Sequence, residues 1–277
     1  MAAGVAGLVA GEVKRMGEDE AVFEARGFIV AWGGVLALAF ADWPPLLLAI
    51  KAMLNAPALD GDARGSELLA QLAEENHGSR WPKITIAALL PDQQLTFEEL
   101  RVLRTLCQQH AEEIAREGLM WNVGELQVAA FTSRSLEQRT DVPIPLKSPQ
   151  VVSCERAASA APRGDGSVGR GTMASSRDLV EDVMQEWERG DLESYLARVN
   201  TGANVLHYTE SCPLEHTLVA LLTSQGGNGG DTILRAVQRF AKAVREHVPG
   251  KFHFFSDSCP SSLHLTLRTL RLRQHSG

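Results

Sequence analysis

Apolar and polar residues alternate along residues 263–270, near the end of the chain. Successive side chains of a strand point to opposite faces, so the pattern predicts a strand with leucines on one face. His264, Thr266 and Arg268 then share the other face. An imidazole, a hydroxyl and a guanidinium in a row suit a phosphate group. Taken alone, however, such alternation more often marks a half-buried strand with a polar outer face.

The first part of the chain contains similar patterns. Residues 35–40 are apolar at every position, which predicts a central strand. Residues 81–89 alternate, and this places Lys83 and Thr85 on one face. The remaining elements predicted here are a helical lead-in over 5–26, a helix over 46–55, a helix from a capping box at 96–99 to about 116, and a strand over 123–131.

The second part of the chain is expected to be mainly helical before its final strand. Capped helices are predicted over 176–188 and 191–199, and another over 231–247. A short strand is expected at 205–208, while residues 214–222 show no pattern that settles their structure.

Composition divides the chain into segments. Residues 1–30 are interpreted as an N-terminal lead-in, 31–146 as one half, 147–176 as a flexible linker and 177–277 as a second half. The linker contains a GxGxxG sequence, but no strand precedes it, so it is not interpreted as a dinucleotide site. The glycine-rich loop near 226–230 lacks the Lys-Ser/Thr of a phosphate-binding P-loop.

Charge and cysteine content narrow the class of protein. A net charge of −7 argues against coating of nucleic acid, although it does not exclude a local basic pocket. The four cysteines form no CxxC pair and no metal-ligand spacing, so we expect reduced thiols and no metal. The apolar run at 27–41 is too short for a membrane span and contains a Gly-Gly pair, which predicts buried β structure. We therefore expect a soluble, cytoplasmic protein without a membrane partner.

The two halves show a common order of elements. Each half runs strand, helix, strand, and each ends on a basic-x-Thr-apolar tetrapeptide, at 83–86 and at 264–267. With these motifs the sequence resembles the 2H phosphoesterase superfamily, which includes RNA ligase-like and cyclic nucleotide phosphodiesterase proteins. The resemblance covers about 35–146 and 200–273. It implies a bilobed, pseudo-two-fold α+β fold in which antiparallel sheets line a central cleft and helices lie outside.

The resemblance also implies a chemistry. Members of the family open 2′,3′-cyclic phosphates, or form and cleave 2′,5′-linkages, without a metal or other cofactor. It makes His264 and Thr266 the expected catalytic residues, with Lys83, Thr85 and Arg268 binding the substrate phosphate. Lys83 stands where the family has its first histidine. A lysine has a pKa near 10.4, so proton transfer at neutral pH would require a fall of about three units.

Other residues offer alternatives. His207 belongs to a second His-x-Thr sequence, but Glu210 follows where an apolar residue is expected, so this match is interpreted as incidental. His77 is expected at the surface, and His253 in the core or at the rim. Arg134 and Arg139 are candidates for adding charge at the mouth of the cleft, with an ordinary surface loop as the default.

Two functions remain open from the sequence. The first is a divergent 2H-type phosphoesterase or phosphate binder that acts on nucleotide or RNA-end 2′,3′-cyclic phosphates. The alternative is a non-catalytic protein-interaction module that kept the 2H-like fold and lost the reaction.

Overall fold

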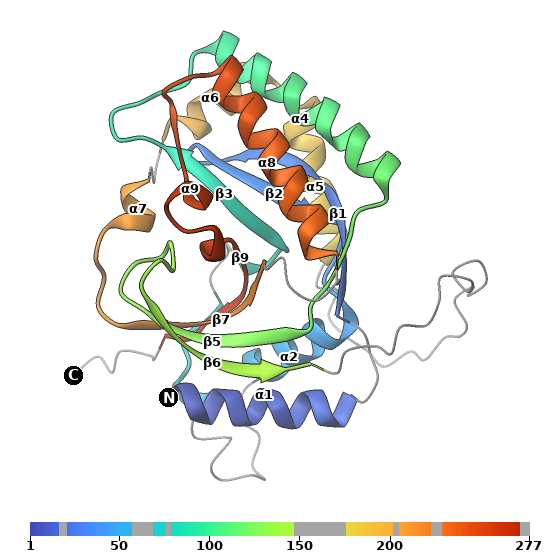
Figure 1. The fold of residues 1–277 in the computed structure, drawn as a ribbon, viewed down its shortest axis with the longest axis vertical. Coiled ribbons are helices and arrows are strands. Elements are labelled where there is room, and N and C mark those ends of the chain that lie inside the picture. Colours follow the sequence, from blue (N-terminus) through green and yellow to red (C-terminus); the bar gives the residue numbers. More distant parts are fainter. Residues whose placement is uncertain are drawn as a thin grey trace.

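The alternating segments form one curled antiparallel sheet (Figure 1). The computed structural model describes residues 1–16, 21–56, 69–75, 79–146, 176–201, 205–222 and 229–271. Within these ranges nine strands pair in the order β4-β1-β2-β3-β9-β7-β5-β6, and β8 also pairs with β3. The strands are β1 Val22–Ala31, β2 Val35–Phe40, β3 Lys83–Leu89, β4 Met120–Asn122, β5 Glu125–Phe131, β6 Arg139–Pro145, β7 Glu215–Leu221, β8 Phe252–Phe254 and β9 His264–Thr269.

Helices complete a mixed α+β structure, as the sequence predicts. They are α1 Ala2–Met16, α2 Pro45–Asn55, α4 Phe97–Glu117, α5 Ser176–Arg189, α6 Leu192–Val199, α7 Leu206–Thr209, α8 Gly230–His247, α9 Phe255–Ser258 and the 3₁₀ helix η2 Pro260–Ser262. The capping box of α4 is confirmed: the Thr96 side chain accepts from the Glu99 amide, and the Glu99 carboxylate accepts from the Thr96 amide.

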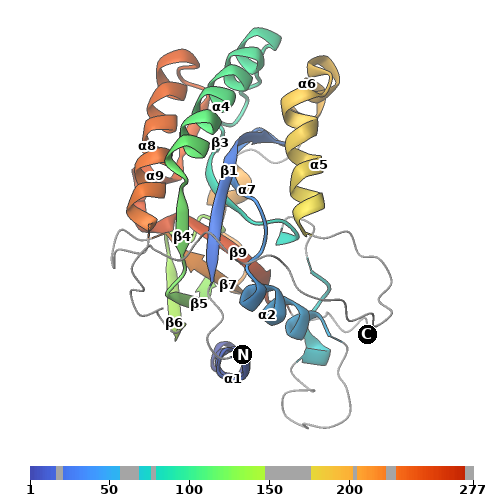
Figure 2. The same cartoon turned by 90° about the vertical axis from the view of Figure 1, so that its right-hand side faces the viewer.

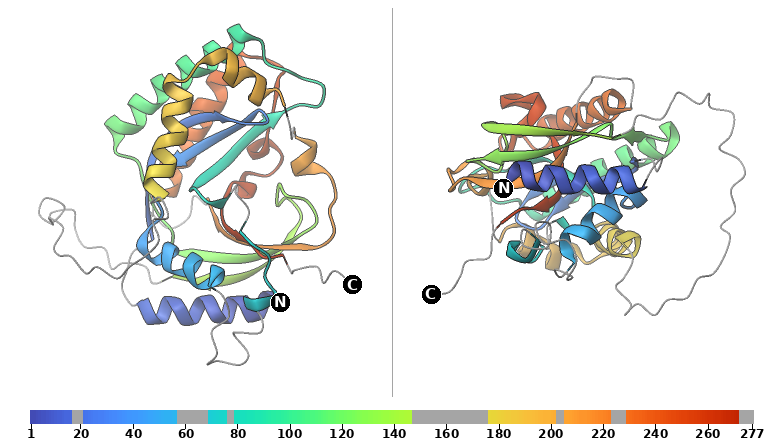
Figure 3. Two further views of the ribbon diagram at one scale, coloured as in Figure 1. Left: turned by 180° about the vertical axis from the view of Figure 1, so that it is seen from behind. Right: turned by 90° about the horizontal axis from the view of Figure 1, so that it is seen from below.

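The helices pack in two groups on the sheet. Helices α4, α5 and α8 lie along the β1 side, where the rings of Phe28 and Phe240 stack with centroids 4.0 Å apart (Figure 2). Helix α1 runs along β5 and β6 at the other end of the molecule, next to α2 (Figure 3). Its buried residues, Val5, Val9 and Val13, recur every four positions and form the apolar stripe that faces the strands.

A strand–helix–strand unit occurs twice. The units are β2-α2-β3 and β7-α8-β9, and their last strands, β3 and β9, pair at the middle of the sheet. The helix of each unit contacts a strand that lies outside that unit. Helix α8 reaches β1 through Phe240, and Lys51 of α2 donates to the carbonyl of Leu267 in β9 at 2.7 Å. The two units are therefore interlocked rather than merely adjacent.

Two predicted elements are wrong. Helix α1 ends at Met16, and the residues from Val22 onward form β1, because Phe23 and Ala25 alternate into the core. Residues 206–209 form the helix α7, in which the amides of Thr209 and Glu210 bond back to carbonyls four residues earlier. The strand that the repeat requires in the second half is β7, in the segment that the sequence leaves open.

Three further predictions concern the linker, His77 and the apolar run at 27–41. The linker (apart from Ser176, which begins α5), its GxGxxG sequence and His77 lie outside the described residues. The apolar run at 27–41 is β structure, as expected: β1 and β2 form a hairpin, and Gly33 and Gly34 turn the chain with φ values of +74° and +70°. No helix in the described ranges has the length and hydropathy needed to span a membrane.

Gly229, which caps α8, permits a close approach of two backbone segments. A Cβ there would lie 2.0 Å from the Met120 carbonyl oxygen, and the φ of +81° is itself unfavourable for other residues. We expect Gly229→Ala to lower the free energy of unfolding by about 3 kcal/mol. Gly118→Ala is the matched control, because Gly118 has a φ of +60° but nothing within 4 Å of its Cβ position. It should cost only about 1 kcal/mol. Urea unfolding measures both, and equal losses would contradict the steric explanation.

Candidate functional site

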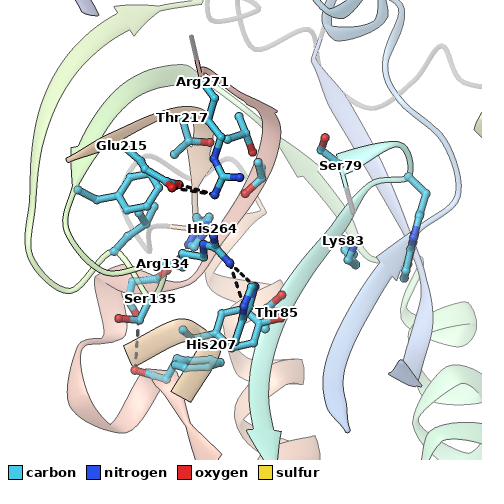
Figure 4. A pocket seen from close by; sticks show the side chains of 18 residues that line it. Ser79, Lys83, Thr85, Arg134, Ser135, His207, Glu215, Thr217, His264 and Arg271 are labelled. Carbon is cyan, nitrogen blue, oxygen red and sulfur yellow. Dashed lines mark hydrogen bonds and ion pairs between the residues drawn. The ribbon is translucent and has the colours of Figure 1, made fainter. Parts of the chain in front are cut away.

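A pocket of about 210 Å³ opens beside β3 and β9 at the middle of the sheet (Figure 4). It is lined by strands β3, β5, β7 and β9, by the loop after β5, and by residues from α7 and α9. The lining residues are Ser79, Trp81, Lys83, Thr85, Phe131, Arg134, Ser135, Leu136, His207, Tyr208, Glu215, Thr217, Phe255, Ser262, His264, Thr266, Thr269 and Arg271.

The structure brings four of the five predicted site residues to this pocket. Ile84 of β3 and Leu265 of β9 are antiparallel partners with buried side chains. The residues on either side of each partner therefore point to the opposite face, toward the pocket. By the antiparallel register, Lys83 lies across from Thr266, and Thr85 lies across from His264.

The expectation that Arg268 shares the face of His264 is wrong. The pairing of β9 with β7 changes register between Thr266, which is opposite Val219, and Arg268, which is opposite Leu218. One extra residue in β9 breaks the alternation, so Thr269 lines the pocket instead. The Arg268 side chain is 2% exposed and donates to the carbonyl of Ala73 at 2.5 Å. Because the Arg268 side chain does not reach the pocket, the phosphate-binding role predicted for it is wrong.

His264 is held in a defined tautomer. Its Nδ1 lies 2.6 Å from the carbonyl oxygen of Ser262, which can only accept, so Nδ1 carries the proton and Nε2 keeps a lone pair. Burial lowers the pKa of His264 to about 4, despite the bond to Ser262, which acts in the opposite direction; Arg139 lowers it further. The imidazole is therefore neutral at pH 7, and its Nε2 offers a lone pair to a hydrogen-bond donor.

The surroundings of Lys83 lower its pKa into the range that proton transfer at neutral pH requires. Burial, and to a lesser degree the charge of Lys51, lower the pKa of Lys83 to about 7. Its Nζ lies 4.1 Å from the centroid of the Trp81 ring. Lys51 is fixed behind β3 and β9, since its Nζ donates to Glu75 and to the carbonyls of Ser79 and Leu267.

Hydroxyl groups surround this pair. Thr85 forms a side-chain hydrogen bond with Tyr208, and burial raises the pKa of the Tyr208 phenol. Thr217 instead donates to the backbone carbonyl of Arg268, at 3.1 Å. Thr266 and Thr269 complete the hydroxyl-bearing wall on β7 and β9. Such groups donate to phosphate oxygens without adding charge.

Further charged residues line the pocket near α7 and β7, and one of them, Arg134, is a residue that the sequence indicates as a candidate for the mouth of the cleft. Arg134 Nη1 lies 2.6 Å from His207 Nε2, and Arg271 forms a two-bond ion pair with Glu215 at 2.7 and 2.9 Å (Figure 4). His207 lies in helix α7 and not on a strand, unlike the histidine of the His-x-Thr motif at 264–266. It nevertheless lines the same pocket.

Two other sequence candidates lie outside the pocket lining. Arg139 is bonded to Asp141 at 2.9 Å and to the Leu136 carbonyl at 2.6 Å, which makes it a support of the loop. His253 lies on β8, and its ring packs against Phe255 with centroids 5.5 Å apart. Tyr208, Glu215 and Thr217 were not identified because residues 205–222 had either the wrong predicted element or none.

The pocket combines positive charge with hydroxyls and aromatic rings. Lys83, Arg134 and Arg271 are balanced by a single lining carboxylate, that of Glu215. This set favours an anion with an attached ring system, such as a phosphate ester of a nucleoside. The described residues contain no group of three or more His, Cys, Asp or Glu side chains placed to hold a metal ion.

Comparisons of the chain with protein-family models, curated proteins and solved structures find no match in any of the three.

Proposed function

We propose that the protein is a 2H-type phosphoesterase that opens 2′,3′-cyclic phosphates of nucleotides or RNA ends. The observation that carries the proposal is the pairing of β3 with β9, which directs Lys83 and Thr85 and also His264 and Thr266 into one pocket. The two interlocked strand–helix–strand units support a bilobed fold of the 2H kind, with the pocket between its halves.

The two proton-transfer groups have different roles in this mechanism. The neutral His264 Nε2 takes a proton from the attacking water, and the oxygen of that water forms the new bond to phosphorus. The bond from phosphorus to one ribose oxygen breaks, and the Lys83 ammonium gives its proton to that oxygen. A phosphomonoester remains, and solvent exchanges the two protons afterwards. No metal or other cofactor is required for the balance of this step.

The pKa values favour this assignment over its reverse. Between pH 4 and 7, His264 is mostly neutral and Lys83 is mostly charged, because their pKa values are about 4 and about 7. The reverse arrangement, a charged His264 with a neutral Lys83, would hold for only about one molecule in a thousand. Lys83 also stabilises the charge that builds on the phosphate, and Thr85 and Thr266 donate to its oxygens.

The experiment is a turnover assay with adenosine 2′,3′-cyclic monophosphate, followed by separation of the 2′- and 3′-monophosphate products. We expect turnover by the wild type and by His247→Ala, which removes an exposed histidine of α8 that does not line the pocket. Calorimetry with the same nucleotide and its 3′-monophosphate product measures binding separately. Absence of both turnover and binding would refute the proposal and favour the interaction module; binding without turnover would leave a phosphate binder and refute the enzyme.

A further inference from the structure

The loop between β5 and β6 is pinned over the pocket by the chain segment that contains α7. The amide of Ser135 donates to the carbonyl of Tyr208 at 2.9 Å, and the amide of Cys212 donates to the carbonyl of Thr132 at 2.7 Å. These two backbone bonds cross-link the segments that carry Arg134 and His207. The two side chains thus come from elements held in a fixed relation to each other (Figure 4).

Burial and a hydrogen bond hold Leu136 of the same loop in a strained conformation. Leu136 has a φ of +57°, which costs a residue with a Cβ about 1–2 kcal/mol. The side chain is 1% exposed, and the Arg139 guanidinium donates to the Leu136 carbonyl at 2.6 Å. Burial and this bond offset the strain, and the loop so held places Arg134 in the lining of the pocket.

Unlike the other arginines around the pocket, Arg134 is paired with a histidine ring and not with a carboxylate. Arg271 is paired with Glu215, and Arg139 is paired with Asp141. Among the described residues no carboxylate lies within ion-pair distance of Arg134, and its guanidinium contacts the ring of His207. Burial together with the charges of Arg134 and Arg271 lowers the pKa of His207, so the ring is a neutral acceptor for the guanidinium.

The cations in and around the pocket act on different groups. Lys51 lowers the pKa of Lys83 and Arg139 lowers that of His264, whereas Arg134 and Arg271 lower that of His207. Lys83 and the Arg134–His207 pair also lie on different sides of the pocket (Figure 4). Positive charge is therefore available on a side of the pocket other than that of Lys83.

We propose that Arg134 binds a second phosphate of the substrate, one attached to the 5′ oxygen of the same ribose. This inference rests on the proposed function and names its substrate class: 2′,3′-cyclic phosphates that are phosphorylated at the 5′ position. A guanidinium without a carboxylate partner binds such a group through two parallel N–H bonds, and a phosphate supplies the negative charge that the Arg134 site lacks. The chemistry is shared by a nucleoside 5′-phosphate and by the terminal residue of an RNA strand.

The test compares three substrates: adenosine 2′,3′-cyclic phosphate with a free 5′ hydroxyl, its 5′-phosphorylated form, and the dinucleotide ApA ending in a 2′,3′-cyclic phosphate. We expect kcat/KM to be at least about tenfold higher for one or both of the 5′-phosphorylated substrates than for the 5′-hydroxyl form. Preference for the mononucleotide identifies a free nucleotide as the substrate, and preference for the dinucleotide identifies an RNA end.

Variants distinguish the Arg134 subsite from general electrostatic attraction. Arg134→Ala should reduce the preference to about one, and Arg134→Lys should restore only part of it, because lysine lacks the planar fork. Lys242→Ala removes an exposed positive charge of α8 and should leave the preference unchanged. Equal activity on all three substrates, or a preference that Arg134→Ala leaves intact, would overturn this inference while the proposed function stands. Inactivity toward all three would count against the proposed function itself.

Discussion

Replacement of His264 by alanine is expected to lower kcat for a 2′,3′-cyclic nucleotide by about 10²–10⁴-fold, the usual contribution of a general base. The physical reason is specific to this pocket. The Ser262 carbonyl fixes the proton on Nδ1, so the only basic atom that His264 offers is Nε2, and the pKa of about 4 keeps that atom unprotonated across the neutral range. Single-turnover kinetics measure the chemical step directly.

His264→Asn provides the matched control for structure. An asparagine amide can still donate to the Ser262 carbonyl but has no basic atom to take a proton. We expect this variant to unfold at a urea concentration close to that of the wild type and to bind the nucleotide with little change, yet to be as inactive as His264→Ala. If His264→Asn retained most of the wild-type rate, the histidine would have a structural role only.

Lys83 carries the second large effect. Lys83→Met is expected to reduce turnover by about 10²–10³-fold, because it removes the proton donor to the leaving oxygen and the positive charge beside the phosphate. Lys83→Arg separates these two contributions: it keeps a charge for binding but does not release a proton at neutral pH. It should retain nucleotide affinity and lose turnover, and a fully active Lys83→Arg would contradict proton donation by Lys83.

The pH dependence gives an independent signature of the same pair. The rate should rise as His264 loses its proton with a pKa of about 4, and fall as Lys83 loses its proton with a pKa of about 7. A profile of kcat/KM against pH reports these values for the free enzyme. Lys83→His should remain active with its alkaline limb moved below pH 7, because burial and Lys51 also disfavour a charged histidine at this position. A limb that does not move when Lys83 is replaced would assign it to another group.

The sequence was sufficient to predict the central strands and the residues that meet between them. Alternation at 81–89 and 263–270 places the side chains on one face of each strand, and the similar order of elements in the two halves indicates that these faces meet. The capping box at Thr96 and the buried β structure over 27–41 are local patterns of the same kind, and both are confirmed. In each case the signal is carried by neighbours within a few positions in the chain.

The remaining features depend on tertiary contacts. Whether β9 has an extra residue is determined by its partner β7, which no pattern in the sequence assigns. The pKa of Lys83 follows from burial and from Lys51, which approaches it only because α2 packs against β9. Arg134 and His207 meet because backbone bonds join distant segments, so the contact between them could not be predicted from the surroundings of either residue in the chain.

The extra residue in β9 has an evolutionary consequence. Substitutions at position 268 cannot place a side chain in the pocket, whatever residue they introduce, since the backbone directs that position into the protein. A deletion of one residue between Thr266 and Arg268 would instead exchange the faces of every later position in the strand. Position 268 can therefore contribute a side chain to this wall only after a change in the length of the strand, whereas positions 266 and 269 already contribute theirs.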